Sequence, residues 1–150
     1  MRKSKMEVNM NVAEAVAQRS HDAETQVGAV LVKNDSGAII ATGFNGFVRG
    51  APDDKLPSTR PEKYPYMRHA EENIISNCAR HGISTNNCTL FCTLTPCCSC
   101  MRLLWQCGIT IVIAKEKYRD WEKLIEMQDL AVDMSMTPEG YWRLTYKEKS

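Results

Sequence analysis

Between residues 95 and 100 the chain reads Thr95-Pro96-Cys97-Cys98-Ser99-Cys100, which places two thiols three positions apart directly after a proline. Upstream, His69-Ala70-Glu71 supplies an imidazole and, two positions on, a carboxylate. Thiolates and imidazoles are common ligands of zinc, and a catalytic zinc keeps one of its four positions open for water. The two motifs therefore predict a catalytic zinc with three protein ligands, around which the remaining chain is arranged.

Both motifs are expected to open a helix. Pro96 suits a first helical turn because its missing N–H is not needed there, and Cys97 and Cys100 would then lie on one face of that turn. The partial positive charge of a helix N-terminus favours thiolates over thiols. Glu71 follows His69 by two positions, so it is expected beside the metal as a proton-transfer group and not as a ligand.

The hydrophobic pattern predicts helices and strands along the whole chain. The expected helices cover 4–20, 69–80, 97–107 and 121–127. The expected strands cover 27–33, 38–42, 89–94, 110–114 and 130–136, with one more short helix or strand in 138–150.

The alternation of helices and strands in the second half indicates parallel strands joined by right-handed helical crossovers. We expect one domain over residues 1–150, an α/β fold formed as a three-layer α-β-α sandwich around a mixed sheet of about five strands. The segment 43–66 contains three of the eight glycines and four of the six prolines. A long irregular segment is more often functional than idle, so this one is expected to wall the pocket.

Composition narrows the class of protein. The formal net charge is +1, which argues against a general nucleic-acid binder. The sequence has no apolar run of signal-peptide or membrane-span length, so we expect a cytoplasmic protein without a membrane partner. Seven cysteines are many for 150 residues; in a reducing compartment they indicate metal ligands and buried thiols. Four of them are expected to be plain core residues: Cys78, Cys88, Cys92 and Cys107.

Other interpretations of the cysteine motif remain open. A Cys-x-x-Cys pair alone could be redox-active or could be half of a closed structural zinc site. A closed site needs a fourth ligand, and Cys107, seven residues beyond Cys100, would lie roughly 10 Å away along a helix axis. His21 and His81 are interpreted as surface or hydrogen-bonded histidines. Cys98 receives no role beyond packing.

His-x-Glu followed by Pro-Cys-x-x-Cys is the signature of the zinc nucleobase deaminases, and the chain resembles that superfamily over nearly its whole length. Within it, the chain most resembles the deoxycytidylate (dCMP) deaminases. Three further stretches carry this resemblance: Arg19-Ser20-His21-Asp22 with Gln26-Val27-Gly28-Ala29; Gly43-Phe44-Asn45-Gly46 with Gly50 and Asp53-Asp54; and Tyr64-Pro65-Tyr66. Phe44 stands where the family has tyrosine.

The resemblance implies a cytidine deaminase-like fold and hydrolytic deamination of dCMP to dUMP, with release of ammonia, which would supply dUMP for dTMP synthesis. His69, Cys97 and Cys100 would bind Zn2+, and Glu71 would shuttle protons to N3 of cytosine and to the leaving ammonia. Further roles follow for substrate-binding residues. The base would contact the amide of Ala70 and the carbonyl near Thr95, and the deoxyribose would contact Asn45. The phosphate would contact Ser20, Thr25 and Arg19.

The resemblance also implies regulation and assembly. Many dCMP deaminases are homohexamers that dCTP with Mg2+ activates and dTTP inhibits. Phe44, Gly46 and Arg49 are therefore candidate effector contacts, and Arg49 is also a second candidate for the substrate phosphate. Arg80 matches a family position at the subunit interface; equally, it could satisfy the last carbonyls of its helix.

Two alternatives from different classes are kept. One is another deaminase of the superfamily, acting on dCTP, free cytosine, riboflavin precursors or adenosine in tRNA. A tRNA enzyme should carry a basic face, which the balanced charge argues against. The other is a non-catalytic, zinc-stabilised module, in which the Glu71 carboxylate would have no use.

Overall fold

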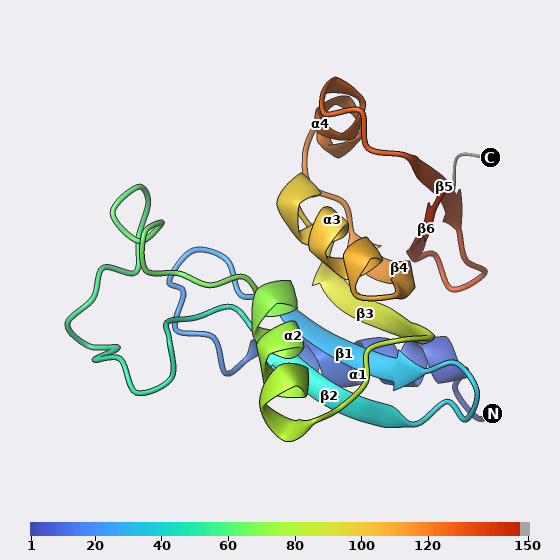
Figure 1. Ribbon diagram of the computed structural model, residues 1–150, viewed down its shortest axis with the longest axis horizontal. Helices are drawn as coiled ribbons and strands as arrows, with labels where there is room; N and C mark the ends of the chain where they lie inside the picture. Colours follow the sequence, from blue (N-terminus) through green and yellow to red (C-terminus); the bar gives the residue numbers. More distant parts are fainter. Residues whose placement is uncertain (148–150) are drawn as a thin grey trace.

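The computed structural model describes residues 1–147 as a mixed sheet covered by helices on both faces (Figure 1). Its helices are α1 (Lys5–Ala17), α2 (Ala70–His81), α3 (Cys98–Gln106) and α4 (Trp121–Met127). Its strands are β1 (Gly28–Lys33), β2 (Ile39–Phe44), β3 (Cys88–Leu94), β4 (Ile109–Glu116), β5 (Val132–Met136) and β6 (Trp142–Tyr146). No helix within 1–147 is both long enough and apolar enough to cross a membrane.

The sheet confirms the expected α/β class and has six strands where about five were expected, in the order β2-β1-β3-β4-β6-β5. β3 and β4 are parallel, as α3 between them requires, and every other neighbouring pair is antiparallel. The strand expected at 130–136 runs in the same direction as β4, as predicted, but it does not pair with β4, because β6 lies between them antiparallel to both. β5 and β6 form a hairpin in which Met136 pairs with Trp142, and β6 lies beside β4, leaving β5 as the edge strand.

The reason for this order is where the apolar side chains lie. Leu144 of β6 is fully buried, whereas Met134 and Met136 of β5 are exposed. The tail 138–150, for which either a helix or a strand was expected, therefore supplies the inner strand of the hairpin. The last three residues of that tail lie outside the described residues.

Both faces of the central strands are buried, because successive side chains of a strand point to opposite faces. Val30 and Val32 of β1 pack with Met10 and Ala13 of α1 in one cluster. Ala29 and Leu31 join the larger cluster on the opposite face, which includes Ile74 of α2 and Leu104 of α3. The two core clusters fix which helices cover which face and leave the starts of α2 and α3 on the same side (Figure 1).

Close packing brings the start of α2 down onto the sheet. Gly43 of β2 lies beneath it, and a Cβ at that position would stand 2.9 Å from Ala70 O and from Ile74 N. The close approach of these two backbones therefore requires glycine at position 43. The irregular segment that precedes α2 extends away from the sheet beside this helix start (Figure 1).

Candidate active site

Three potential metal ligands meet where α2 and α3 begin. His69 is the N-cap of α2, Cys97 is the N-cap of α3, and Cys100 lies in the first turn of α3. Nδ1 of His69 lies 3.6 Å from Sγ of Cys97 and 3.4 Å from Sγ of Cys100. Tetrahedral zinc with bonds of about 2.0–2.3 Å holds its ligand atoms roughly 3.5–3.8 Å apart. The described residues therefore offer three donors at zinc spacing.

Local interactions orient these ligands. Glu72 accepts a hydrogen bond of 3.1 Å from the main-chain N–H of His69, which closes the start of α2 as in a capping box. Trp121 Nε1 donates to Pro96 O at 2.9 Å, and the Cys98 thiol lies 3.7 Å from Leu124 O. Helix α4 thus holds the segment that carries the thiols, and Cys98 packs between α3 and α4.

The two thiols and the imidazole form a charged set. The hydrogen bond from Cys100 lowers the pKa of the Cys97 thiol to about 4, although burial opposes this, and His69 lowers it further. The same hydrogen bond and burial raise the pKa of Cys100. The hydrogen bond with Cys97 raises the pKa of His69. The lowered pKa of Cys97 favours its thiolate form, and a thiolate is a donor that zinc binds.

Glu71 is the buried carboxylate beside this set. It is the second residue of α2, it is 4% exposed, and burial raises its pKa. Its Oε1 atom accepts a hydrogen bond of 3.1 Å from Sγ of Cys92. Cys92 was expected to be a plain core residue. It is buried as expected, but sequence reasoning missed its contact with Glu71, since nothing in the spacing of the two residues indicates it.

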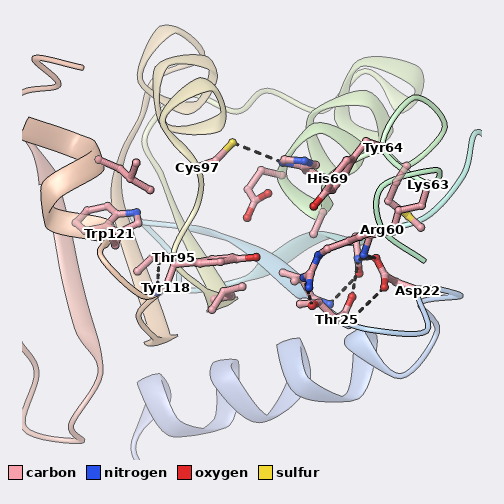
Figure 2. A pocket seen from close by; sticks show the side chains of 17 residues that line it. Asp22, Thr25, Arg60, Lys63, Tyr64, His69, Thr95, Cys97, Tyr118 and Trp121 are labelled. Atoms are coloured by element: carbon pink, nitrogen blue, oxygen red, sulfur yellow. Dashed lines mark hydrogen bonds and ion pairs between the residues drawn. The ribbon is translucent and has the colours of Figure 1, made fainter. Parts of the chain in front are cut away.

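His69, Cys97 and Glu71 open onto a cavity of about 350 Å³, within the usual range for small-molecule sites. Figure 2 shows His69 and Cys97 on one side of it and Thr25 with Arg60 on another. The cavity is lined by Asp22, Thr25, Val27, Asn45, Arg60, Lys63, Tyr64, Met67, His69, Ala70, Glu71, Leu94, Thr95, Cys97, Tyr118, Trp121 and Leu124.

Most of the expected substrate-binding residues lie here, but two do not. Thr25, Asn45, Ala70 and Thr95 line the cavity. Ser20 is buried away from its wall, and its hydroxyl accepts a hydrogen bond of 3.2 Å from the Asp22 amide. Arg19, expected at the substrate phosphate, lines a second cavity instead.

Asn45 holds the neighbouring segment in place. Its Oδ1 atom accepts from Val27 N at 2.8 Å, and its Nδ2 atom donates to Thr25 O at 2.8 Å and to Asp22 Oδ2 at 3.4 Å. The side-chain amide is thus bonded at both ends to residues 22–27. In the structure, Asn45 therefore holds residues 22–27, which form the part of the cavity wall that includes Thr25.

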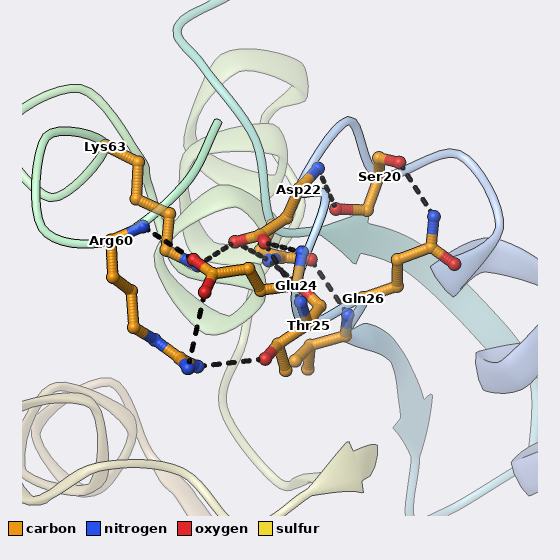
Figure 3. Close-up of polar contacts among 9 residues, drawn as sticks. Ser20, Asp22, Glu24, Thr25, Gln26, Arg60 and Lys63 are labelled. Atoms are coloured by element: carbon orange, nitrogen blue, oxygen red, sulfur yellow. Dashed lines mark hydrogen bonds and ion pairs between the residues drawn. The ribbon is translucent and has the colours of Figure 1, made fainter. Parts of the chain in front are cut away.

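Two basic residues that sequence reasoning missed stand on this wall (Figure 3). Lys63 is 4% exposed, and its Nζ atom lies 2.7 Å from Asp22 Oδ2 and 3.4 Å from Glu24 Oε1. Arg60 is exposed, and its Nη2 atom donates to Thr25 Oγ1 at 3.1 Å. Both lie in the segment 43–66 that was expected to wall the pocket, and Lys63 directly precedes the Tyr64-Pro65-Tyr66 stretch. These two signals pointed near the basic residues without identifying them.

The ion pair beneath this wall is strong. Burial would raise the pKa of Asp22, but the hydrogen bonds from Lys63 and from the amides of Thr25 and Glu24 outweigh it, and the pKa is lowered. Lys63 is therefore paired with Asp22 and Glu24. Arg60 donates to the Thr25 hydroxyl and also forms an ion pair with Glu24, in which Nη1 lies 3.7 Å from Oε2.

A second cavity, of about 540 Å³, lies on the other side of the Asn45 segment and is rich in arginine. The four expected effector residues all line it: Phe44, Gly46, Arg49 and Arg80. Further guanidinium groups come from Arg19 and Arg68, and Arg49 Nη2 donates to Asn77 Oδ1 at 3.3 Å. Gly46 and Arg68 form a two-way β-bridge, with N···O distances of 3.0 and 2.7 Å. Phe44 and Gly46 thus line the second cavity, while Asn45, which stands between them in the sequence, lines the first.

The fold and the site define a class of protein. An α/β fold with three metal donors beside a buried carboxylate is the arrangement of metal-dependent hydrolases. Residues 3–116 match the family model of the cytidine and deoxycytidylate deaminase zinc-binding region. The chain belongs to this family, and its donor set fits the zinc that the family description names.

Relatives agree with this assignment. The deoxycytidylate deaminase of Homo sapiens is 39% identical over 118 residues, covering 74% of this chain and 65% of that protein. The probable deoxycytidylate deaminase of Drosophila melanogaster is 38% identical over 116 residues, covering 69% of this chain and 56% of that protein. The chain spans 65% of the length of the human relative.

Solved structures show the same fold. The dCMP deaminase of cyanophage S-TIM5 in apo form has a TM-score of 0.69 and 30% identity, covering 85% of this chain and 94% of that chain. The same protein in complex with dCMP and dUMP has a TM-score of 0.66 and 31% identity, covering 85% and 93%. Cytidine deaminase from Burkholderia pseudomallei, at 18% identity and a TM-score of 0.52, shares the fold.

Proposed function

We propose that the protein deaminates dCMP hydrolytically to dUMP, releasing ammonia, with Zn2+ held by His69, Cys97 and Cys100. One observation carries this proposal: the buried carboxylate of Glu71 borders the same cavity as His69 and Cys97, which together with Cys100 form a group of three metal donors. A purely structural zinc site would close its shell with a fourth protein ligand, and the described residues group three donors here. The relatives named as deoxycytidylate deaminases support the choice of reaction.

The zinc, when bound, supplies acidity, since it lowers the pKa of a coordinated water to about 7. Glu71 moves the protons. Its carboxylate takes one proton from the attacking water and delivers it to N3 of cytosine. It then takes the remaining proton of the hydroxyl added at C4 and delivers it to the amino group, which leaves as ammonia while the C4 carbonyl forms. Burial raises the pKa of Glu71, so the side chain can carry each of these protons in turn.

Substrate recognition is proposed along the cavity wall. The apolar side chains of Val27, Leu94 and Trp121 suit a planar base, and the Ala70 amide and the Thr95 carbonyl are the proposed polar contacts to it. Asn45 is the proposed partner of the deoxyribose, while it also orders residues 22–27.

For the phosphate we propose Arg60 with Thr25, in place of the Ser20 and Arg19 expected from the sequence. Arg60 and Thr25 line the cavity and are hydrogen-bonded to each other, and a guanidinium group suits a phosphate dianion because it can donate two parallel hydrogen bonds. Lys63 supports the wall through Asp22 and Glu24.

We also propose that dCTP with Mg2+ activates the enzyme and dTTP inhibits it, at the arginine-rich second cavity. Positive charge for a triphosphate comes from four arginines that line this cavity: Arg19, Arg49, Arg68 and Arg80. Asp53 lines the same cavity and offers a carboxylate oxygen, the kind of ligand that Mg2+ prefers. A homohexamer and a cytoplasmic location complete the proposal. The location is supported by the seven free thiols, which suit a reducing compartment.

The test is a steady-state panel of dCMP, dCTP, deoxycytidine and cytosine, following ammonia release by the zinc-loaded protein. We expect dCMP to have the highest kcat/KM. The Glu71→Ala variant should keep about one zinc per chain and lose at least about 10³-fold in kcat, because proton transfer is removed. Normal deamination by this variant would refute the mechanism. Preference for another substrate in the panel would favour another deaminase of the superfamily, and zinc binding without any turnover would favour a non-catalytic module.

A further inference from the structure

Cys92 lies in the middle of β3, and its Sγ atom is 3.1 Å from Oε1 of Glu71. Cys92 is 0% exposed and Glu71 is 4% exposed, so water does not compete for the contact. We propose that Cys92 is a positioning residue, whose S–H group holds one oxygen of the Glu71 carboxylate so that the other oxygen is available for proton transfer. This inference rests on the proposed deaminase function.

The direction of the hydrogen bond follows from the chemistry of the two groups. An ionised carboxylate can only accept hydrogen bonds, whereas a thiol has one weak donor. Burial, and then the neighbouring Glu71 carboxylate, raise the pKa of Cys92 well above its usual range. The thiol therefore keeps its proton and can donate it to Glu71 Oε1.

The sheet makes room for this contact. In the strand register Cys92 stands between Ala29 of β1 and Ala114 of β4, and both alanines are fully buried. Because both neighbours are alanines, this face of the sheet has room for Sγ of Cys92 and the side chain of Glu71. Among the side chains of residues 1–147, Cys92 is the one that donates a hydrogen bond to the Glu71 carboxylate.

The contact has a clear consequence for the proposed mechanism. A buried carboxylate oxygen without a partner is costly, and a glutamate held by no partner can rotate about its side-chain bonds. Holding Oε1 restricts rotation of the carboxylate, which leaves Oε2 for proton transfer in the cavity that Glu71 lines. A rotation that moved the proton-carrying oxygen would reduce kcat, because proton transfer requires hydrogen-bond reach.

The kinetic test compares Cys92→Val, which replaces the thiol by an aliphatic group without a donor, with Cys92→Ser, which keeps a donor. We expect Cys92→Val to lower kcat on dCMP about tenfold with KM changed by less than about twofold, because the lost interaction acts during proton transfer and not in binding. Cys92→Ser should restore kcat to within about threefold of the wild type, since its hydroxyl can donate to the same oxygen.

The matched control is Cys88→Val, at the other fully buried thiol of the same strand, which contacts main-chain oxygens of Ser84 and Asn86. Its kcat should equal that of the wild type even if its Tm falls. Wild-type kcat in Cys92→Val, or an equal loss in Cys92→Ser and Cys88→Val, would overturn the positioning role.

A second readout does not need turnover. The infrared S–H stretching band lies where proteins absorb little, and hydrogen bonding to an anion shifts it to lower frequency. The difference spectrum between wild type and Cys92→Val should contain such a shifted band, and Glu71→Gln should move it back toward higher frequency. A Cys92 band at the frequency of a free thiol would overturn the inference. A wild type inactive on dCMP but with the shifted band would refute the proposed function and leave the Cys92–Glu71 bond supported.

Discussion

Arg60 and Thr25 meet at the wall of the cavity through a hydrogen bond of 3.1 Å. The Arg60→Ala variant should raise KM for dCMP by about 10- to 100-fold with kcat little changed, because a charge-assisted contact to the phosphate contributes about 1.5–3 kcal/mol to ground and transition state alike. Deoxycytidine, which lacks the phosphate, should not distinguish the variant from the wild type. Steady-state kinetics on both substrates measure this, and Arg19→Ala is the comparison: a rise in KM there and not in Arg60→Ala would restore the original assignment.

At the residue scale the sequence revealed the groups whose spacing is local and missed those that meet through folding. His69 and Glu71 are neighbours in one turn, and Cys97 and Cys100 in another, so their spacing predicted the set that the structure brings together. Arg60 meets Thr25 across 35 positions and Cys92 meets Glu71 across 21. Contacts over such separations depend on strand register and loop path, which a single sequence does not encode in any local pattern.

At the element scale, Gly43 determines how closely α2 approaches the sheet. In Gly43→Ala the added methyl group would meet Ala70 O and Ile74 N at 2.9 Å, which forces the helix start outward. We expect a loss of about 1–3 kcal/mol of stability, measured as a lower Tm, together with a lower kcat because α2 carries Glu71. Gly46→Ala is the stability control, since its Cβ would meet no atom closer than 3.8 Å. An unchanged Tm in Gly43→Ala would contradict the packing argument.

The helices at the two motifs were predicted well because capping and proline signals mark their starts. α2 begins at Ala70 and α3 at Cys98, each one residue after the predicted start, since His69 and Cys97 are N-caps. The order of the last two strands could not be predicted. Both strands of the hairpin carry apolar residues, and only the packing of Leu144 against the core determines which of them lies beside β4.

At the scale of the whole molecule, two cavities share one segment of chain. We expect dCTP with Mg2+ to raise the velocity at low dCMP and dTTP to lower it, because the occupant of the arginine-lined cavity contacts Phe44 and Gly46 on either side of Asn45. Initial velocity against dCMP, with each nucleotide added, measures this. Hyperbolic curves that neither nucleotide alters would contradict regulation at the second cavity and leave the deaminase proposal standing.

The β-bridge between Gly46 and Arg68 joins the residue after Asn45 to the residue before His69. A displacement of this bridge from the second cavity would therefore move Asn45 and His69 together. Thermodynamic reciprocity then sets a fixed relation: whatever factor an anion in the second cavity applies to the affinity for dCMP, dCMP must apply to the affinity for that anion. Binding isotherms of the two ligands, each measured with and without the other, should give one coupling constant.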